Sequence, residues 1–443
     1  MKLKKEVKLK KALGLFEATA YGVGIILGAG IYALIGHAAG IAGNAIWLSF
    51  VVAAIIASFT AFSYAELSGM FSKEAAEFIY VKEATRRKSL AFIIGWVGIV
   101  TGIVSVSTVA LGFGGYFQAI FGTPQILNAL ALIAALSLLN FWGIKESAKF
   151  NIVATAVEML GLLIIIALGV SFFGNVNYLE VPGNALPFSP EFFSTILAAT
   201  AIIFFAYLGF EEMANMSEET KNAKKTIPKA LLIALAISTV IYILVSIAAV
   251  SAVPWNELSQ SKAPLATVAE KSFGGSAYFL LAVMALFATA NTVLILLIVT
   301  SRMLYGMASE SSLPKWLAKV HDGRKTPHIA IALSAVFAML FTLLGKIGVV
   351  ASITDFGVFV VFLSVNAAVV LLRYSKPNAK RTFKAPISIG KFPVLSFLGA
   401  LFCFLMLFQF IEVVHILGYD IPIIIFGLVV VALGYPIYKI INK

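Results

Sequence analysis

The strongest constraint in this sequence is a series of long apolar segments that continues almost to its end. A membrane-spanning helix needs roughly 20 mostly apolar residues. In hydrocarbon every backbone N–H and C=O must be paired inside the protein, so such segments fold as helices. The sequence therefore predicts an all-α integral membrane protein with about 12 transmembrane helices. The expected spans are residues 15–36, 45–70, 89–120, 125–142, 147–173, 191–216, 226–252, 276–309, 327–345, 349–373, 393–415 and 420–441.

Composition supports this class of protein. The chain is 60% hydrophobic and 12% charged, whereas a soluble protein is about 45–50% apolar and about 25% charged. A water-soluble globule is therefore excluded. Cys403 is the single cysteine, which excludes an intramolecular disulfide, and only four histidines accompany it. We expect neither a metal nor a cofactor. Two amphipathic stretches, 74–87 and 256–273, predict interfacial or loop helices.

The positions of the cations predict the orientation in the membrane. The basic tail, residues 1–14, precedes the first span and is expected on the cytoplasmic side. Of the 33 Lys and Arg residues, only Lys262, Lys271 and Lys346 then lie outside, and the other 30 lie inside. This asymmetry follows the positive-inside rule. We expect a multi-pass plasma-membrane protein with both termini cytoplasmic, whose net charge of +12 reflects topology and not nucleic-acid binding.

Two of the expected spans contain an interruption. The first carries Gly22, Gly24, Gly28 and Gly30, and glycine both weakens a helix and lets a ligand approach the backbone. The sixth carries Gly209, followed by two acids, in mid-segment. If five helices repeat as five, spans one and six occupy corresponding positions. Interrupted helices at such positions indicate the binding site of a transporter.

Several segments together resemble the amino acid–polyamine–organocation (APC) superfamily of permeases. Gly-Val-Gly-Ile-Ile-Leu-Gly-Ala-Gly-Ile-Tyr resembles its first-helix motif, and Ser-Glu-Glu-Thr-Lys-Asn-Ala-Lys-Lys-Thr-Ile-Pro-Lys resembles the loop after its sixth helix. The combination is specific, although one glycine cluster alone would be weak. The similar segments are residues 22–32, 63–67, 204–229, 301–314 and 326–327, within a likeness that covers roughly residues 12–375.

The resemblance implies an inverted 5+5 helix repeat with broken helices 1 and 6, plus two extra C-terminal helices. It also implies alternating-access transport of amino acids. The corresponding divisions are the tail 1–14, a first repeat 15–182, a second repeat 183–390, and helices 11 and 12 in 391–443.

The first break is expected to hold the carboxylate of an amino acid. If Gly28, Ala29 and Gly30 are unwound, their free N–H groups lie at the start of a half-helix, where the helix dipole attracts anions. The alternative is that the glycines only allow close helix packing.

The sixth break is expected to bind the amino group. The resemblance implies that freed carbonyls accept hydrogen bonds from the ammonium. Two aromatic side chains of this segment are also expected to close over the ligand as a gate. The alternative for the aromatics is ordinary packing in the core or against lipid. The residues concerned are Ile26, Phe205, Ala206 and Leu208 for the carbonyls, and Phe205 and Tyr207 for the gate.

Glu158 is the candidate ion-coupling residue. It lies about 16 Å along its span by the helical rise. A charged acid at such a depth costs at least about 2.5–3.5 kcal/mol unless it is paired, protonated or hydrated. It can exchange a proton, or complete a cation site with oxygens of Thr289 or Asn291. The alternative is a neutral, hydrogen-bonded acid. This position resembles one that holds a lysine in some proton-coupled members of the superfamily. This chain has a glutamate there and so departs from that pattern.

The expected function is secondary active transport of neutral amino acids, with proton symport preferred. Exchange, sodium symport, and transport of cationic amino acids or polyamines remain alternatives, and a channel or an intramembrane enzyme is more remote. A channel favours continuous pore helices, and an enzyme requires clustered catalytic groups, so we expect no enzyme. The expected partners are an amino acid, a proton or sodium ion, and the bilayer. Glu218 and Glu219 stand among lysines and are expected to be solvated.

Overall fold

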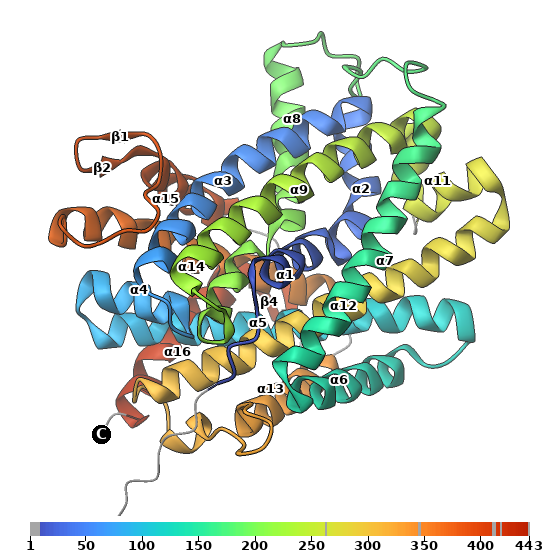
Figure 1. Cartoon of the computed structure of the whole chain (residues 1–443). Coiled ribbons are helices and arrows are strands. Elements are labelled where there is room, and N and C mark those ends of the chain that lie inside the picture. The colour runs from blue at the N-terminus through green and yellow to red at the C-terminus, as the bar shows by residue number, and fades with distance from the viewer. Residues whose placement is uncertain (1–8, 262–263, 344–346, 410–412, 417–418, 442–443) are drawn as a thin grey trace, which may run out of the picture.

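Helices make up most of the chain, as Figure 1 shows. The computed structural model describes residues 9–261, 264–343, 347–409, 413–416 and 419–441. Part of the basic tail, residues 1–8, lies outside this range. The helices in the expected spans are α1 (Leu15–Leu27), α2 (Ala29–Ala42), α3 (Ile46–Met70), α5 (Lys88–Phe121), α6 (Gln125–Trp142), α7 (Ile144–Val170), α8 (Pro190–Ile203), α9 (Ala223–Ala252), α12 (Gly275–Ser309), α13 (His328–Thr342), α14 (Ile347–Ser375), α15 (Val394–Met406) and α16 (Ile423–Ile441).

The lengths and apolarity of these helices confirm the membrane fold. Eight helical segments of the described chain are long and apolar enough to cross a membrane. A bent pair, Pro190–Thr200 with Phe204–Glu219, forms a ninth, and three shorter apolar helices complete the set: His328–Thr342, Val394–Met406 and Gly427–Ile441. The protein is therefore an all-α multi-pass membrane protein.

Local sequence explains where several helices begin and end. Ser189 caps α8, because its hydroxyl accepts a hydrogen bond from the Phe192 N–H at 3.2 Å. The helix α5 ends at Phe121 and is capped by Gly122, which has a φ of 72° and is followed closely by Pro124. The predicted amphipathic stretches are helical too. They form α4 (Ala76–Thr85) at the first stretch, and α10 (Trp255–Gln260) and α11 (Pro264–Phe273) at the second.

The C-terminal region differs from the prediction of two uninterrupted helices at 393–415 and 420–441. The first helix, α15, ends at Met406 and passes into η5 (Leu407–Gln409). The strands β3 (Val413–Ile416) and β4 (Tyr419–Pro422) then pair antiparallel before α16 begins. The valines and isoleucines here favour extended backbone, and hydropathy alone does not separate an apolar strand from an apolar helix. Residues 410–412 of the predicted span lie outside the described range.

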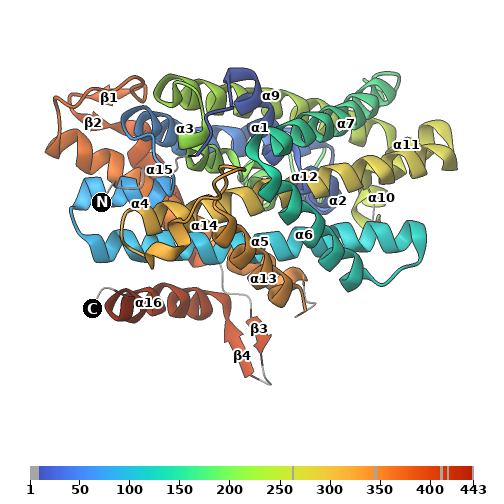
Figure 2. The same ribbon diagram turned by 60° about the horizontal axis from the view of Figure 1, so that its bottom comes forward.

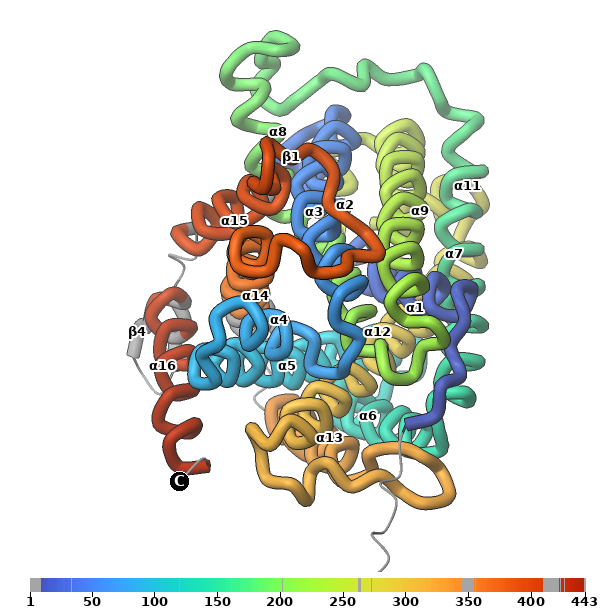
Figure 3. Tube along the Cα trace, turned by 60° about the vertical axis from the view of Figure 1, so that its left-hand side comes forward, coloured from blue at the N-terminus to red at the C-terminus, as the bar shows by residue number. Residues whose placement is uncertain are grey.

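The centre of the bundle is formed by α1 and α12. The apolar part of α12 is 83% buried, against 28% for α6. Figure 1 shows α1 surrounded by α9, α7 and α12, and all three contact it. The last helices lie at the periphery: α15 packs against α14, and α16 packs against α5. Figure 2 shows the β3–β4 hairpin projecting beyond the bundle, and Figure 3 shows α16 at its outer edge.

Backbone hydrogen bonds join the N-terminal segment to the end of the sixth span. Leu13 forms a parallel β-bridge with Thr220. The N–H groups of Ala12 and Leu13 donate to the carbonyl of Glu219 at 2.9 and 3.1 Å, and the Lys221 N–H donates to the carbonyl of Leu13 at 2.8 Å. We call these three hydrogen bonds the tail strap. They hold the start of α1 beside the end of η3 (Phe210–Glu219).

Candidate substrate and ion site

The first span is broken at Gly28, as the glycines predict. The helix α1 ends at Leu27, Gly28 has φ −42° and ψ −149°, and α2 begins at Ala29. The first N–H groups of an α-helix have no partner inside it, and no side chain caps this one. A Cβ on Gly28 would lie 2.1 Å from the hydroxyl oxygen of Thr292. A side chain at Gly28 would therefore displace the Thr292 hydroxyl where α1 meets α12.

The sixth span is broken between Ile203 and Phe210. The helix α8 gives way to the short 3₁₀ turn η2 (Phe204–Tyr207), and Leu208 is extended. Gly209 has a φ of 118°, and the remainder of the span is the 3₁₀ helix η3. The axis of Phe204–Glu219, which contains this break, is bent by 47° from that of Pro190–Thr200. A φ of this value is strained for any residue with a side chain, so glycine fixes the position of the break.

The two breaks lie against each other. A Cβ on Gly30 would lie 2.9 Å from Cα of Ala206. The carbonyls of Ile26 and Ala206 both face the hydroxyl of Tyr242, which donates to the Ile26 oxygen and lies 2.9 Å from the Ala206 oxygen. The fold thus brings the start of α2 and carbonyls from both broken spans into one small region.

The other residues predicted at the sixth break, Phe205, Tyr207 and Leu208, differ in their burial and in their hydrogen-bond partners. The Phe205 carbonyl accepts the Leu208 N–H at 3.2 Å, so it already has one partner. Tyr207 is buried, and its hydroxyl donates to the Phe50 carbonyl of α3 at 3.0 Å. Phe205 and Leu208 are half-buried. The gating role of Phe205 and Tyr207 remains a prediction. Tyr207 packs against α3 and α9, with its ring centroid 6.5 Å from that of Phe50 and 5.3 Å from that of Tyr242.

Glu158 is fully buried on α7. Asn291 approaches its carboxyl group, but neither carboxyl oxygen has a hydrogen bond of normal geometry among the described residues. The Tyr32 hydroxyl donates to the backbone carbonyl of Glu158 at 3.2 Å, and not to its carboxyl group. A buried, unsatisfied carboxyl group is costly unless a proton or a cation occupies it. This environment is compatible with an ion-coupling role.

The two predicted neighbours of Glu158 on α12 differ. Thr289 donates its hydroxyl within its own helix, to the Ala285 carbonyl at 2.8 Å. Asn291 instead reaches α7: its amide nitrogen donates to Thr155 at 3.1 Å, and its oxygen accepts from Asn151 at 2.9 Å. The structure therefore brings Asn291, more than Thr289, toward the acid.

Sequence reasoning missed several residues of this region. Asn151 and Thr155 precede Glu158 by seven and three positions, which places all three on one face of α7, and this spacing was a usable signal. Gly24, already noted in the glycine cluster, leaves room for this polar group, because a Cβ there would lie 2.2 Å from the Thr155 hydroxyl and 2.5 Å from the Asn291 nitrogen. Tyr242 stands in an apolar run without any such signal.

Glu219 is not solvated, which corrects the expectation from its lysine neighbours. It is fully buried and forms a two-pronged ion pair with Arg302 of α12, at 2.9 and 3.1 Å. Arg302 also donates to the side-chain oxygen of Asn140 at 2.8 Å. The pair joins the end of η3 to α12. Burial of both charges shows that the adjacent chain segments exclude water there.

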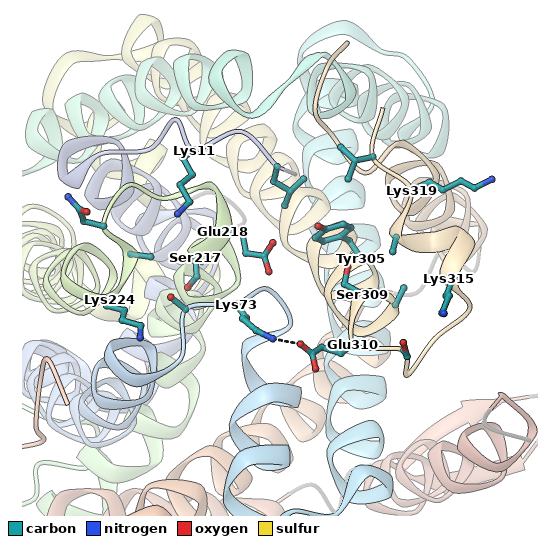
Figure 4. Close-up of a pocket in the computed structure, with 18 of the residues that line it drawn as sticks. Lys11, Lys73, Ser217, Glu218, Lys224, Tyr305, Ser309, Glu310, Lys315 and Lys319 are labelled. Atoms are coloured by element: carbon teal, nitrogen blue, oxygen red, sulfur yellow. Dashed lines mark hydrogen bonds and ion pairs between the residues drawn. The ribbon is translucent and has the colours of Figure 1, made fainter. Parts of the chain in front are cut away.

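A basic vestibule of about 1920 Å³ opens beside this ion pair. Figure 4 shows that lysines and Glu310 surround it, with Glu218 and Tyr305. Lys73 and Lys82 both pair with Glu310. The hydrogen bond between Lys73 and Glu310 raises the pKa of the Lys73 ammonium. Glu218 lines the vestibule, whereas the next residue, Glu219, is buried. Its lysines are Lys11, Lys73, Lys224, Lys225, Lys315, Lys319 and Lys380.

Known proteins resemble the chain over most of its length. Residues 13–432 match the model of a family described as amino acid permease. The branched-chain amino acid permease BcaP of Bacillus subtilis is 30% identical over 423 residues, which covers 91% of this chain and 88% of that protein. The methylthioribose transporter of Bacillus subtilis is 30% identical over 415 residues, covering 88% and 87%. The cationic amino acid transporter 4 of Mus musculus is 29% identical over 395 residues, covering 84% and 61%.

Proposed function

Because the chain belongs to the amino acid permease family, we propose that it is a secondary active transporter that carries neutral amino acids by alternating access together with protons. It is not an enzyme on this proposal. The observation that carries it is the contact between the two broken spans at Gly30 and Ala206. The first break offers helix N–H groups, and both broken spans offer carbonyl oxygens.

A zwitterion fits this distribution of partial charge. The carboxylate would lie at the start of α2, where the N–H groups of Gly28, Ala29 and Gly30 and the helix dipole favour an anion. The ammonium would lie at the carbonyls of Ile26 and Ala206, which already converge on one donor. An α-amino acid satisfies both ends at once.

A neutral substrate side chain fits the surroundings of the breaks best. The atoms closest to a Cβ built at Gly30 and Gly209 belong to Ala206 and Ile25, which are apolar. A cationic substrate side chain needs a carboxylate partner when it is buried. Of the buried carboxylates near the breaks, Glu211 already accepts the Gly209 N–H at 2.8 Å, and we assign Glu158 to the coupling ion. The named substrates of the relatives differ, so their names alone do not choose among these classes.

Proton coupling is supported by the environment of Glu158. Its unsatisfied carboxyl oxygens favour the neutral, protonated form inside the bundle. A change in hydration between the two states of the transporter would then load the proton on one side and release it on the other. Sodium is the rival ion, since the carboxylate and the side chain of Asn291 can supply oxygen ligands.

The orientation follows from charge. The vestibule beside the tail strap is lined by lysines, and cation-rich segments remain on the cytoplasmic side of a membrane. We therefore place this vestibule and both termini in the cytoplasm, and the protein in the plasma membrane.

Transport in reconstituted vesicles tests the proposal. The purified chain is placed in liposomes, and uptake of each common labelled amino acid is measured under an inward proton gradient, under an inward sodium gradient, and against a preloaded lumen. We expect neutral amino acids to accumulate under the proton gradient alone, with protein-free liposomes as the control. If accumulation required sodium at fixed pH, the coupling ion would be sodium and not the proton. Uptake only against a preloaded lumen would indicate exchange, and preference for lysine or arginine would overturn the substrate class.

A further inference from the structure

The hydroxyl of Tyr242 occupies an unusual position. Tyr242 lies on α9, is fully buried, and packs its ring against Phe50 and Tyr207 with centroids 5.4 and 5.3 Å away. Its hydroxyl reaches the carbonyls of Ile26 and Ala206, one from each broken span. The phenol therefore stands where the proposed function places the ammonium of the substrate.

The Tyr242 hydroxyl has fewer hydrogens to donate than there are carbonyl oxygens facing it. A tyrosine hydroxyl has one hydrogen to donate, whereas each carbonyl oxygen can accept. The hydroxyl can therefore satisfy only one of the two carbonyls fully, at Ile26 or at Ala206. A primary ammonium has three hydrogens and can satisfy both. Without either donor, two buried carbonyls from the breaks would face each other unpaired, which is unfavourable.

We propose that Tyr242 is a positioning residue whose hydroxyl replaces the substrate ammonium in the empty transporter. This inference rests on the proposed function. In the empty protein the hydroxyl bridges the two broken spans, so that the bundle can close without cargo. When an amino acid enters, its ammonium displaces the hydroxyl from both carbonyls. Nothing covalent changes in either step.

The consequence concerns the return of the empty transporter. Net uptake requires the protein to reorient without substrate after each delivery, whereas exchange requires only the loaded form to reorient. If Tyr242 stabilises the empty closed form, its hydroxyl is needed for net uptake and not for exchange. A general loss of packing would impair both processes together.

The test compares Tyr242→Phe with the parent in liposomes. Net uptake into empty vesicles and exchange against a preloaded lumen are measured with the same labelled amino acid, and the substrate Kd is measured in detergent. We expect net uptake to fall about tenfold, in line with the cost of a buried unpaired carbonyl. Exchange should stay within about twofold of the parent, and the Kd should be unchanged or lower, because no hydroxyl has to be displaced.

The matched control is Tyr80→Phe. Tyr80 is buried on α4, and its hydroxyl has no hydrogen-bond partner in the part of the chain that the structure describes. We expect this variant to keep both activities. The inference fails if Tyr242→Phe keeps parental net uptake, if it loses net uptake and exchange equally, or if its Kd rises. It also fails if the parent exchanges but shows no net uptake. If the parent moves no amino acid in either assay, the proposed function itself is wrong.

Discussion

Replacing Gly30 tests the contact between the two broken spans most directly. A Cβ at this position would lie 2.9 Å from Cα and 3.2 Å from Cβ of Ala206, and the nearer atom is backbone. Ordinary contact begins at 3.4 Å, so α2 and the sixth span must separate by at least the difference, 0.5 Å. Such a shift would move the N–H groups of α2 relative to the carbonyl of Ala206. Both ends of the proposed substrate site would then be misplaced.

The expected size of the effect follows from two opposing contributions. Overpacking costs about 1–3 kcal/mol, while replacing glycine by alanine in a helix regains about 0.5–1 kcal/mol. The net cost of Gly30→Ala is therefore about 0–2.5 kcal/mol, which lowers exchange by at most about 60-fold at tenfold per about 1.4 kcal/mol. Gly30→Val adds two further methyl groups and regains less, because a β-branched side chain is less favourable in a helix. Its loss should exceed about 100-fold.

The assay is exchange of a labelled amino acid in liposomes, with the thermal unfolding midpoint in detergent as the test of folding. Gly112→Val in α5 is the control, because a Cβ at Gly112 meets no atom within 4 Å. It should transport like the parent. A Gly30→Val variant that folds and exchanges at the parental rate would refute the assignment of the site.

The decarboxylated amine of a good substrate should compete with uptake at least about 100-fold less well than the amino acid, since it lacks two charge-assisted hydrogen bonds to the start of α2; equal competition would remove the carboxylate from Gly30. Glu158→Gln mimics the protonated acid, so uptake measurements should show that exchange persists while accumulation driven by a pH gradient is lost. Parental accumulation under both proton and sodium gradients would make Glu158 structural. Glu219→Gln leaves Arg302 buried without its partner and should cost about 3–5 kcal/mol of stability, seen as a lower unfolding midpoint in detergent. As the control, Glu257→Gln breaks the exposed pair with Lys271 and should cost less than about 1 kcal/mol. If the two variants lowered the unfolding midpoint equally, burial would not explain the strength of the Glu219–Arg302 pair.

Features that depend on neighbouring residues could be predicted from the sequence. Apolar length predicts most spans, and the glycine clusters predict both breaks, because glycine leaves room beside Thr292 at Gly28 and adopts the φ of 118° at Gly209 without strain. Depth alone singled out Glu158, since its position follows from the rise of one helix. The domain boundaries at 182 and 390 remain predictions.

Features that depend on distant segments could not be predicted in the same way. Tyr242 meets carbonyls that are 216 and 36 residues away, and no periodicity links these positions. Arg302 and Glu219 are 83 residues apart, so the lysines adjacent to Glu219 misled the expectation of a solvated acid. The β3–β4 hairpin was missed because hydropathy does not separate a short apolar strand such as Val413–Ile416 from the end of an apolar helix.

The tail strap has a consequence for how freely the sequence can vary. All three of its donors are backbone N–H groups, of Ala12, Leu13 and Lys221. Side chains at Ala12 and Lys221 can therefore change without removing a hydrogen bond, and random substitution leaves this connection between the first and sixth spans in place. Proline is the exception, because it has no N–H to donate. Mutational tolerance at these two positions should consequently be broad, with a single gap at proline.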